Sequence, residues 1–257
     1  MIVGSNRDEV KFWLALSEYF VATDSSFGGS LFRLPKIVLK DEAAYEAFNY
    51  YRSTAWKVRG VDEPLQNLAN AGNNQLFSYR FDWDDQRKYI IADFKKLFGA
   101  THALEVPLLI GDDSLVGGSP VANFIYPKGP SKFYMSRNIM KFWTNFAKSG
   151  DPGYSTNNIK WEPYLDNTKN IDSYIILDNR KNLTMSSKKT SLKILSDELY
   201  FDDRLTEIEK CVVLYQMFTF VGNDTYEENV KNYQGKCNRK VSEQFIKDNA
   251  GTVNIDY

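Results

Sequence analysis

The stretch Gln75–Gly111 decides the fold, and it opens with Gln-Leu-Phe-Ser-Tyr-Arg-Phe-Asp-Trp at positions 75–83. This run is rich in aromatic residues and is bounded by Asn73-Asn74 and Asp84-Asp85, which predicts a buried strand. A polar loop and a short helix over 90–98 are expected next, followed by His102, the only histidine of the chain. Because histidine changes charge near neutral pH at its ordinary pKa, His102 is the natural candidate for a general base. A lone histidine is more often a packed or surface residue, so its position alone leaves both roles open.

The bulk composition is that of a globular chain with no strong charge preference. The 257 residues are 43% hydrophobic and 15% aromatic, which is enough for a sizeable core in one large domain or two small ones. A net charge of −1 gives no reason to expect nucleic acid or an anionic membrane as a partner. No stretch approaches the 18 or so apolar residues of a membrane span, and no signal peptide is visible, which leaves the compartment open.

Characteristic short motifs surround His102 and lie on both sides of it. They are Val3-Gly4-Ser5-Asn6-Arg7-Asp8-Glu9, then Tyr79–Trp83 with His102–Pro107 and Gly111, and then Met140–Pro152. In this order they resemble the type-B carboxylesterase and cholinesterase family, and the resemblance runs from residue 1 to about residue 220. The family motif His-Gly-x-Glu carries the histidine of a catalytic triad, which corresponds to His102. The sequence departs from that motif at Ala103, where the family usually has glycine.

The resemblance implies a fold of the α/β class. The chain is expected to form the C-terminal portion of an α/β-hydrolase fold, with an incomplete, mostly parallel central sheet flanked by helices and a small C-terminal hairpin. Residues 1–222 would form this part of the domain. Residues 223–257 are polar and are expected to be a loosely attached tail.

Hydrophobic periodicity and capping residues predict the individual elements. Asp41 and Asp203 are expected as helix N-caps, and Gly72 is expected to end a helix. The predicted strands cover residues 1–4 and 75–83, the hairpin covers 174–177 and 183–185, and the helices cover 10–20, 41–51, 62–71, 131–148, 187–199 and 203–221, with a loop over 21–35.

In the resembled family the chemistry is the hydrolysis of carboxylic esters by a serine, a histidine and an acid. His102 would act as general base and acid. The resemblance implies that Asp8 and Glu9 are a structural acidic pair at the end of the first strand. They are also the nearest candidates in sequence for a substitute for the missing acid, but the structural role is favoured. Glu105 lies three residues after His102 and is expected to support the histidine through a hydrogen bond within the loop that positions it. The nucleophile, the oxyanion loop and the catalytic acid are expected upstream of Val3.

No serine of the chain has the sequence context of the expected nucleophile. The nucleophile elbow of an α/β-hydrolase requires Gly-x-Ser-x-Gly on a strand-to-helix turn. Ser30 and Ser119 each follow glycine but lack the second glycine, so both are interpreted as ordinary loop residues. The chain alone is therefore expected to be inactive, and a partner carrying the missing half is expected to complete the sheet and the site. Without that partner, unpaired strand edges favour self-association.

Other sites are weakly indicated. One histidine and two cysteines do not make a usual zinc site, and no glycine-rich phosphate loop is present, so no metal and no cofactor are expected. The contexts of Cys211 and Cys237 favour two free thiols, although a disulfide between them would contribute roughly 3 kcal/mol. Asn182-Leu183-Thr184 and Asn223-Asp224-Thr225 match the glycosylation acceptor pattern, which also arises by chance.

Two alternatives to an esterase stay open on the sequence. Cholinesterase-like domains also serve as non-catalytic interaction modules that have lost the triad. The chain is alternatively a truncated gene product without its own activity. Retention of His102 in its motif favours descent from an enzyme whose substrate is a carboxylic ester.

Overall fold

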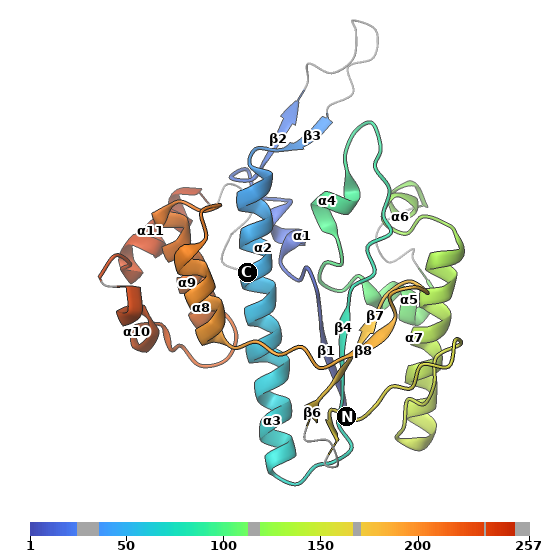
Figure 1. The fold of residues 1–257 in the computed structure, drawn as a ribbon. Helices are drawn as coiled ribbons and strands as arrows, with labels where there is room; N and C mark the ends of the chain where they lie inside the picture. Colours follow the sequence, from blue (N-terminus) through green and yellow to red (C-terminus); the bar gives the residue numbers. More distant parts are fainter. Residues whose placement is uncertain (25–35, 113–118, 167–170, 234, 250–257) are drawn as a thin grey trace, which may run out of the picture.

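The fold is built around a four-stranded mixed sheet (Figure 1). The structure is a computed structural model, and it describes residues 1–24, 36–112, 119–166, 171–233 and 235–249. The strand order is β1-β4-β7-β8; the first three strands are parallel, and β8 pairs antiparallel with β7. The predicted α/β class, with a mostly parallel sheet and a C-terminal hairpin, is confirmed. The strands of this sheet are β1 (Ile2–Asn6), β4 (Phe77–Phe81), β7 (Tyr174–Leu177) and β8 (Thr184–Ser186). Two small antiparallel pairs accompany it, β2 (Val21–Asp24) with β3 (Lys36–Leu39) and β5 (Leu165–Asp166) with β6 (Ile171–Asp172).

The pairing of β1 with β4 fixes where the candidate site forms. The register runs from Ile2 opposite Phe77 to Asn6 opposite Phe81, so both strands end at the same edge. Gly4 lies opposite Tyr79, and a Cβ at Gly4 would approach the Tyr79 ring to 2.3 Å. The absence of a side chain at Gly4 therefore allows the aromatic ring to lie across the neighbouring strand.

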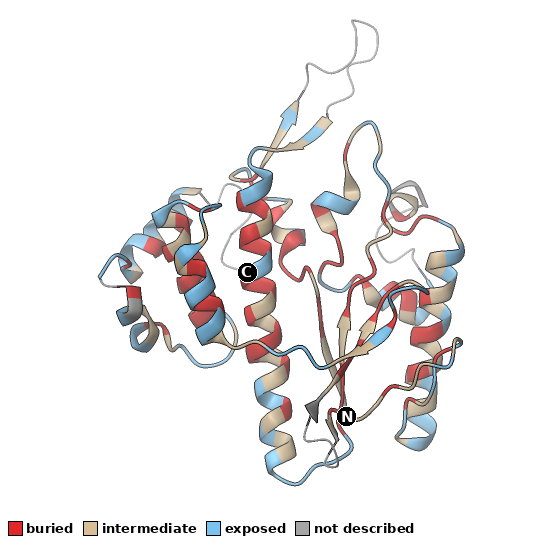
Figure 2. Ribbon diagram, in the orientation of Figure 1, coloured by how far each residue is buried: buried red, intermediate tan, exposed pale blue. Residues whose placement is uncertain are grey.

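Helices cover both faces of the sheet (Figure 1). The long α2 lies on one face and α7 with α5 on the other, while α8, α9 and α11 form a further layer against α2. Figure 2 shows buried residues along the length of α2, which contributes Tyr45, Phe48 and Tyr51 to the core shared with α8 and α9. The helical elements are α1 (Lys11–Leu14), α2 (Glu42–Lys57), η1 (Val58–Asp62), α3 (Glu63–Asn70), α4 (Phe94–Phe98), α5 (Glu105–Ile110), α6 (Ser119–Ile125), α7 (Pro130–Ser149), α8 (Leu192–Phe201), α9 (Glu207–Thr219), α10 (Tyr226–Asn229), η3 (Val230–Tyr233) and α11 (Arg239–Asn249). Within the described ranges, no helix has both the length and the apolar character that a membrane span requires.

Several predicted boundaries hold because local chemistry sets them. Asp41 caps α2 by accepting a hydrogen bond from the Ala44 amide at 2.9 Å, as predicted. Gly72 has a φ of +90° directly after α3, which is the left-handed conformation expected of a glycine that ends a helix. The predicted helices 41–51 and 62–71 are joined in the structure by η1, a π-helical turn.

Other boundaries differ from the prediction. The helix expected over 10–20 is only the four-residue α1, after which the Ser17 hydroxyl accepts a hydrogen bond from the Tyr19 amide. The stretch expected as loop from residue 21 begins instead with β2. The N-cap of α9 is Thr206 rather than Asp203, because Thr206 and Glu209 form a reciprocal capping box.

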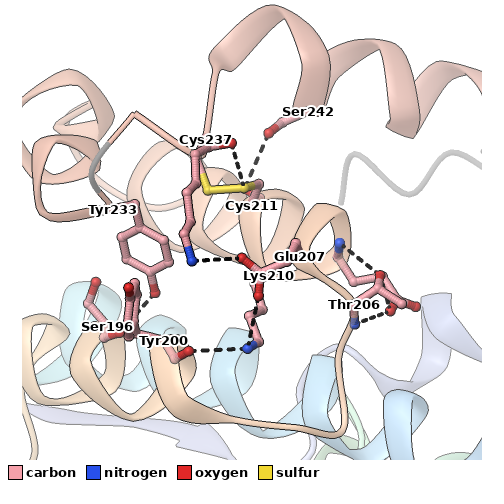
Figure 3. Close-up of a disulfide and its surroundings, with 11 residues drawn as sticks. Ser196, Tyr200, Thr206, Glu207, Lys210, Cys211, Tyr233, Cys237 and Ser242 are labelled. Atoms are coloured by element: carbon pink, nitrogen blue, oxygen red, sulfur yellow. Dashed lines mark hydrogen bonds and ion pairs between the residues drawn. A yellow bond between two sulfur atoms is a disulfide. The ribbon is translucent and has the colours of Figure 1, made fainter.

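The predicted loose tail is wrong for the described residues beyond 222 (Figure 3). Tyr226, Tyr233 and Ile246 are buried at 0%, 3% and 1% exposure in the core around α9. A disulfide joins Cys211 in α9 to Cys237, so the preference for two free thiols is also wrong. Sequence contexts did not reveal the pairing because it depends on η3 returning the chain to α9; the Tyr233 hydroxyl donates to the Ser196 carbonyl in α8 at 2.8 Å.

The disulfide is expected to stabilise the fold by restricting the unfolded chain. It closes a loop with a sequence separation of 26 residues, for which loss of the cross-link costs about 3 kcal/mol. Denaturant unfolding of the wild-type chain with and without reductant should show this decrease in the free energy of unfolding. The Cys211→Ala/Cys237→Ala double variant should be equally destabilised and indifferent to reductant. A wild-type midpoint that does not move when both thiols titrate as free would contradict the expectation.

Candidate catalytic site

Backbone hydrogen bonds bring two distant segments together at the end of β1. The Asp8 amide donates to the Ala100 carbonyl at 3.1 Å, and the His102 amide donates to the Glu9 carbonyl at 3.3 Å. The Thr101 hydroxyl accepts from the Phe12 amide at 2.8 Å, which attaches α1 to the same loop. The loop that carries His102 is therefore held against the residues that directly follow β1.

The side chains of Glu9 and His102 are in direct contact. Glu9 Oε2 lies 2.7 Å from His102 Nδ1, although the two residues are 93 positions apart. The other carboxylate oxygen, Oε1, accepts a hydrogen bond from the backbone amide of Asn6 at 2.7 Å. Glu9 is buried, with 4% exposure. Glu9 was expected to be half of a structural acidic pair, and in the structure one of its carboxylate oxygens also contacts the imidazole.

The contact with Glu9 raises the pKa of the His102 imidazole. The hydrogen bond to Glu9 raises the pKa of His102, burial lowers it, and the charges of Glu9 and Glu105 add to the increase. An ionised carboxylate only accepts hydrogen bonds, so Nδ1 carries the hydrogen in this pair. In the neutral imidazole, Nε2 is then left as the acceptor.

Asp8, the other member of the acidic pair, accepts hydrogen bonds from groups in different parts of the fold. Its Oδ1 accepts from Asn49 in α2 at 2.7 Å, and its Oδ2 accepts from the Ala100 amide at 2.9 Å and from Arg7 at 2.7 Å. Burial alone would raise the pKa of Asp8, but Arg7, Lys11 and the Ala100 amide outweigh it and lower the pKa. Asp8 is thus an ionised group that joins β1, α2 and the loop after Gly99.

Asn6 links the acids of the site, a role that the sequence did not reveal. Its side-chain amide donates to the Thr101 carbonyl at 2.5 Å and to Glu105 Oε2 at 2.7 Å. Glu105 was expected to hydrogen-bond within its own loop, but its side-chain partners are Asn6 in β1 and the Tyr79 hydroxyl in β4, the latter at 3.4 Å. Burial raises the pKa of Glu105. Glu105 therefore supports His102 indirectly, through Asn6.

His102 is accessible on one side and enclosed by aromatic rings on the other. Its side chain is 46% exposed, in agreement with the prediction that it is not sealed in the core. The ring centroids of Trp13 and Trp56 lie 5.3 Å and 5.4 Å from that of the imidazole, and the two indoles stack on each other at 6.2 Å. Phe220 in turn packs on Trp56 at 5.0 Å. These rings limit how far the imidazole can rotate away from Glu9.

The residue after the histidine has an unusual backbone conformation. Ala103 has a φ of +62°, in the left-handed region that glycine adopts more readily. This is the position at which the sequence departs from the His-Gly-x-Glu motif. The departure therefore puts conformational strain directly beside the imidazole.

Of the two serines considered in the sequence, the structure describes only the backbone of Ser119. Ser30 lies outside the described residues, and Ser119 begins α6 rather than lying in a loop. Among the residues that the structure describes, no group of three or more histidine, cysteine, aspartate and glutamate side chains is arranged to hold a metal ion.

Comparisons with known proteins agree on one family. The chain is 34% identical over 132 residues to human bile salt-activated lipase, covering 50% of this chain and 15% of that protein. It is 31% identical over 107 residues to para-nitrobenzyl esterase of Bacillus subtilis, covering 40% of this chain and 19% of that protein. The chain thus spans 15–20% of the length of the curated relatives that it matches.

Solved structures of similar proteins are also esterases. The carboxylesterase EST55 of Geobacillus stearothermophilus matches 73% of this chain and 38% of its own, with 18% identity and a TM-score of 0.44. An esterase of Clostridium hathewayi matches 72% of this chain and 34% of its own, with 17% identity and a TM-score of 0.42. The model of the carboxylesterase family matches residues 40–195, more than half of the sequence, and the chain belongs to that family.

Proposed function

We propose that this chain supplies the histidine and the acid of a serine carboxylesterase. His102 is the general base and acid, and Glu9 is the acid that orients it. The observation that carries the proposal is the 2.7 Å contact between Glu9 Oε2 and His102 Nδ1. Family membership supports ester hydrolysis as the reaction, and the names of the relatives support carboxylic esters as the substrate class.

The pair performs the two proton transfers of ester hydrolysis. Glu9 fixes the tautomer with hydrogen on Nδ1, which leaves Nε2 to take the proton of an attacking hydroxyl. The resulting imidazolium is stabilised by the buried carboxylate of Glu9. It then donates the proton from Nε2 to the leaving alkoxide, and the cycle repeats with water in deacylation. The raised pKa of His102 is the ground-state sign of this stabilisation.

The nucleophile is proposed to come from polypeptide outside these 257 residues. None of the serines of the sequence lies in Gly-x-Ser-x-Gly. The chain matches a small part of its relatives' length, so a further portion carrying the serine and the oxyanion donors is the proposed partner. The earlier expectation that this portion also carries the acid is replaced by the assignment of Glu9.

Removal of the imidazole should abolish catalysis in the polypeptide that holds both this chain and the nucleophile. His102→Ala is expected to lower kcat for p-nitrophenyl acetate by roughly 10⁴- to 10⁶-fold, as removal of a triad member does. Glu9→Gln should lower kcat by about 10⁴-fold, because an amide favours the wrong tautomer. Glu105→Gln is the matched control, with a clearly smaller loss. A tenfold loss or less for His102→Ala would contradict the assignment, and serine-reagent labelling of the isolated chain would contradict the external nucleophile.

The coupling between Glu9 and His102 is measurable without a substrate. Because His102 is the only histidine, its imidazole proton resonances titrate alone in an NMR spectrum. Glu9→Gln is expected to lower the pKa of His102, since it removes both the charged hydrogen bond and the attraction that raise it. Glu105→Gln should lower the pKa less, because Glu105 raises the pKa of His102 only through its charge and without a hydrogen bond to the imidazole. Equal shifts in the two variants would contradict the assigned pairing.

The same coupling has a defined effect on stability. The pKa of His102 is raised in the folded protein, so the stabilisation is fully present below the unfolded-state pKa and is lost as pH rises through the folded-state pKa. The difference in unfolding free energy between wild type and Glu9→Gln should therefore shrink as pH rises through that window. Urea unfolding at a series of pH values measures it.

The strained residue beside the imidazole gives a further test. Ala103→Gly should relieve a left-handed conformation that costs roughly 1–2 kcal/mol, while adding about 0.5–1 kcal/mol of chain entropy to the unfolded state. A net stabilisation of up to about 1.5 kcal/mol is expected from these opposing effects. Ala15→Gly is the control, because Ala15 has an ordinary φ of −67° and should lose stability. Parallel destabilisation of both variants would contradict the strain at Ala103.

A further inference from the structure

We propose that Asn223 is a site of N-linked glycosylation and that this chain matures in an oxidising secretory compartment. The tripeptide Asn223-Asp224-Thr225 is an acceptor pattern, which is weak evidence alone. The structure adds two independent observations. One is the setting of the Asn223 side chain, and the other is the disulfide that encloses it.

Asn223 lies where a glycan can be attached without disturbing the fold. It is exposed, in the bend between α9 and α10. Its backbone carbonyl accepts a hydrogen bond from Arg59, which holds the bend in place. Its side-chain amide makes no hydrogen bond with any residue that the structure describes. The backbone at Asn223 is thus held in place, while its side-chain nitrogen, to which the glycan would be attached, is exposed to solvent.

The disulfide indicates the compartment in which this modification occurs. Cys211 and Cys237 are both buried, at 4% and 8% exposure, and are joined to each other. Structural disulfides of this kind form in oxidising compartments and are rare in a reducing cytosol. Asn223 lies between the two cysteines in sequence, inside the loop that they close. The same compartment therefore provides both the oxidation and the glycan transfer.

The second acceptor pattern, Asn182-Leu183-Thr184, has a less suitable setting. The Asn182 side-chain amide donates to Asp178 Oδ2 at 3.0 Å, and Asp178 is buried at 7% exposure. Leu183 is buried at 3%, and Thr184 is paired within the β7–β8 hairpin. A sugar on this nitrogen would press on the turn that connects the hairpin. The structure therefore favours Asn223 over Asn182.

The modification is a simple glycosyl transfer. A bond forms between Asn223 Nδ2 and the anomeric carbon of a lipid-linked oligosaccharide pyrophosphate. The bond from that carbon to the pyrophosphate oxygen breaks, the lipid pyrophosphate leaves with the electron pair, and the amide nitrogen loses one proton. No electron is gained or lost, and the thiol oxidation that forms the disulfide is a separate reaction.

Occupancy is measured on the chain secreted from a eukaryotic cell. Digestion with peptide N-glycosidase in heavy-oxygen water converts an occupied asparagine to labelled aspartate, which tryptic mass spectrometry assigns to residue 223 or 182. The expected result is conversion at Asn223 and a gel shift on deglycosylation. An unconverted Asn223 would overturn the proposal, whether or not Asn182 is converted.

Variants separate the acceptor pattern from the fold. Thr225→Ala and Asn223→Gln should each remove the gel shift at Asn223, and Thr225→Ser should keep it. Asn223→Gln retains the backbone carbonyl that Arg59 binds, so folding is expected to survive, and absence of titratable thiols in the native variant verifies it. Persistence of conversion at residue 223 in Thr225→Ala would overturn the acceptor assignment. None of these readouts depends on esterase activity.

Discussion

The buried carboxylate of Asp8 is the constraint on which the site depends. A buried charge is tolerated only when its oxygens are satisfied, and Asp8 obtains its partners from three separate parts of the chain: Arg7 beside it, Asn49 in α2 and the Ala100 amide before His102. Gly99 makes the approach possible, because a Cβ there would lie 2.3 Å from Asp8 Oδ2. Once Asp8 is satisfied, the end of β1, the middle of α2 and the histidine loop can no longer move independently. Glu9, the next residue, is then presented to the imidazole.

Much of the fold was predictable because its determinants are local. The aromatic run at 75–83 became β4, the hairpin at 174–185 formed as expected, and Asp41 capped α2 through its own side chain. Each of these depends on periodicity or on a side chain bonding a backbone group a few residues away. His102 was found for a different reason, since it lies in a recognisable family motif.

The remainder depends on contacts between residues far apart in sequence. The Glu9–His102 pair joins residues 93 positions apart. Backbone hydrogen bonds from Asp8 to Ala100 and from His102 to Glu9 bring the two segments together, and no local pattern shows them. The role of Asn6 could not be predicted, because an asparagine at a strand end gives no local signal that it will donate three hydrogen bonds, to Glu9, Thr101 and Glu105. The disulfide was missed because the polar context of Cys237 is a property of sequence neighbours, whereas its burial comes from α9. The N-cap of α9 is the exception, because the capping box of Thr206 and Glu209 spans only three residues and is a local signal that favours Thr206 over Asp203.

The π-helical turn η1 makes chain length itself a constraint on this fold. Each residue of a helix turns its successors by about 100°. Before η1, Trp56 contacts His102. Within η1, Arg59 donates a hydrogen bond to the Met217 carbonyl near the end of α9. After η1, Leu65 is buried together with Leu76. Loss of one residue from Val58–Asp62 would leave the composition almost unchanged and yet rotate α3 away from Leu76. Insertions and deletions should therefore be far less acceptable here than in the loop over 84–92, where no helix transmits the rotation. The number of residues in the continuous helix α2–η1–α3, and not only their chemistry, is therefore constrained in this sequence.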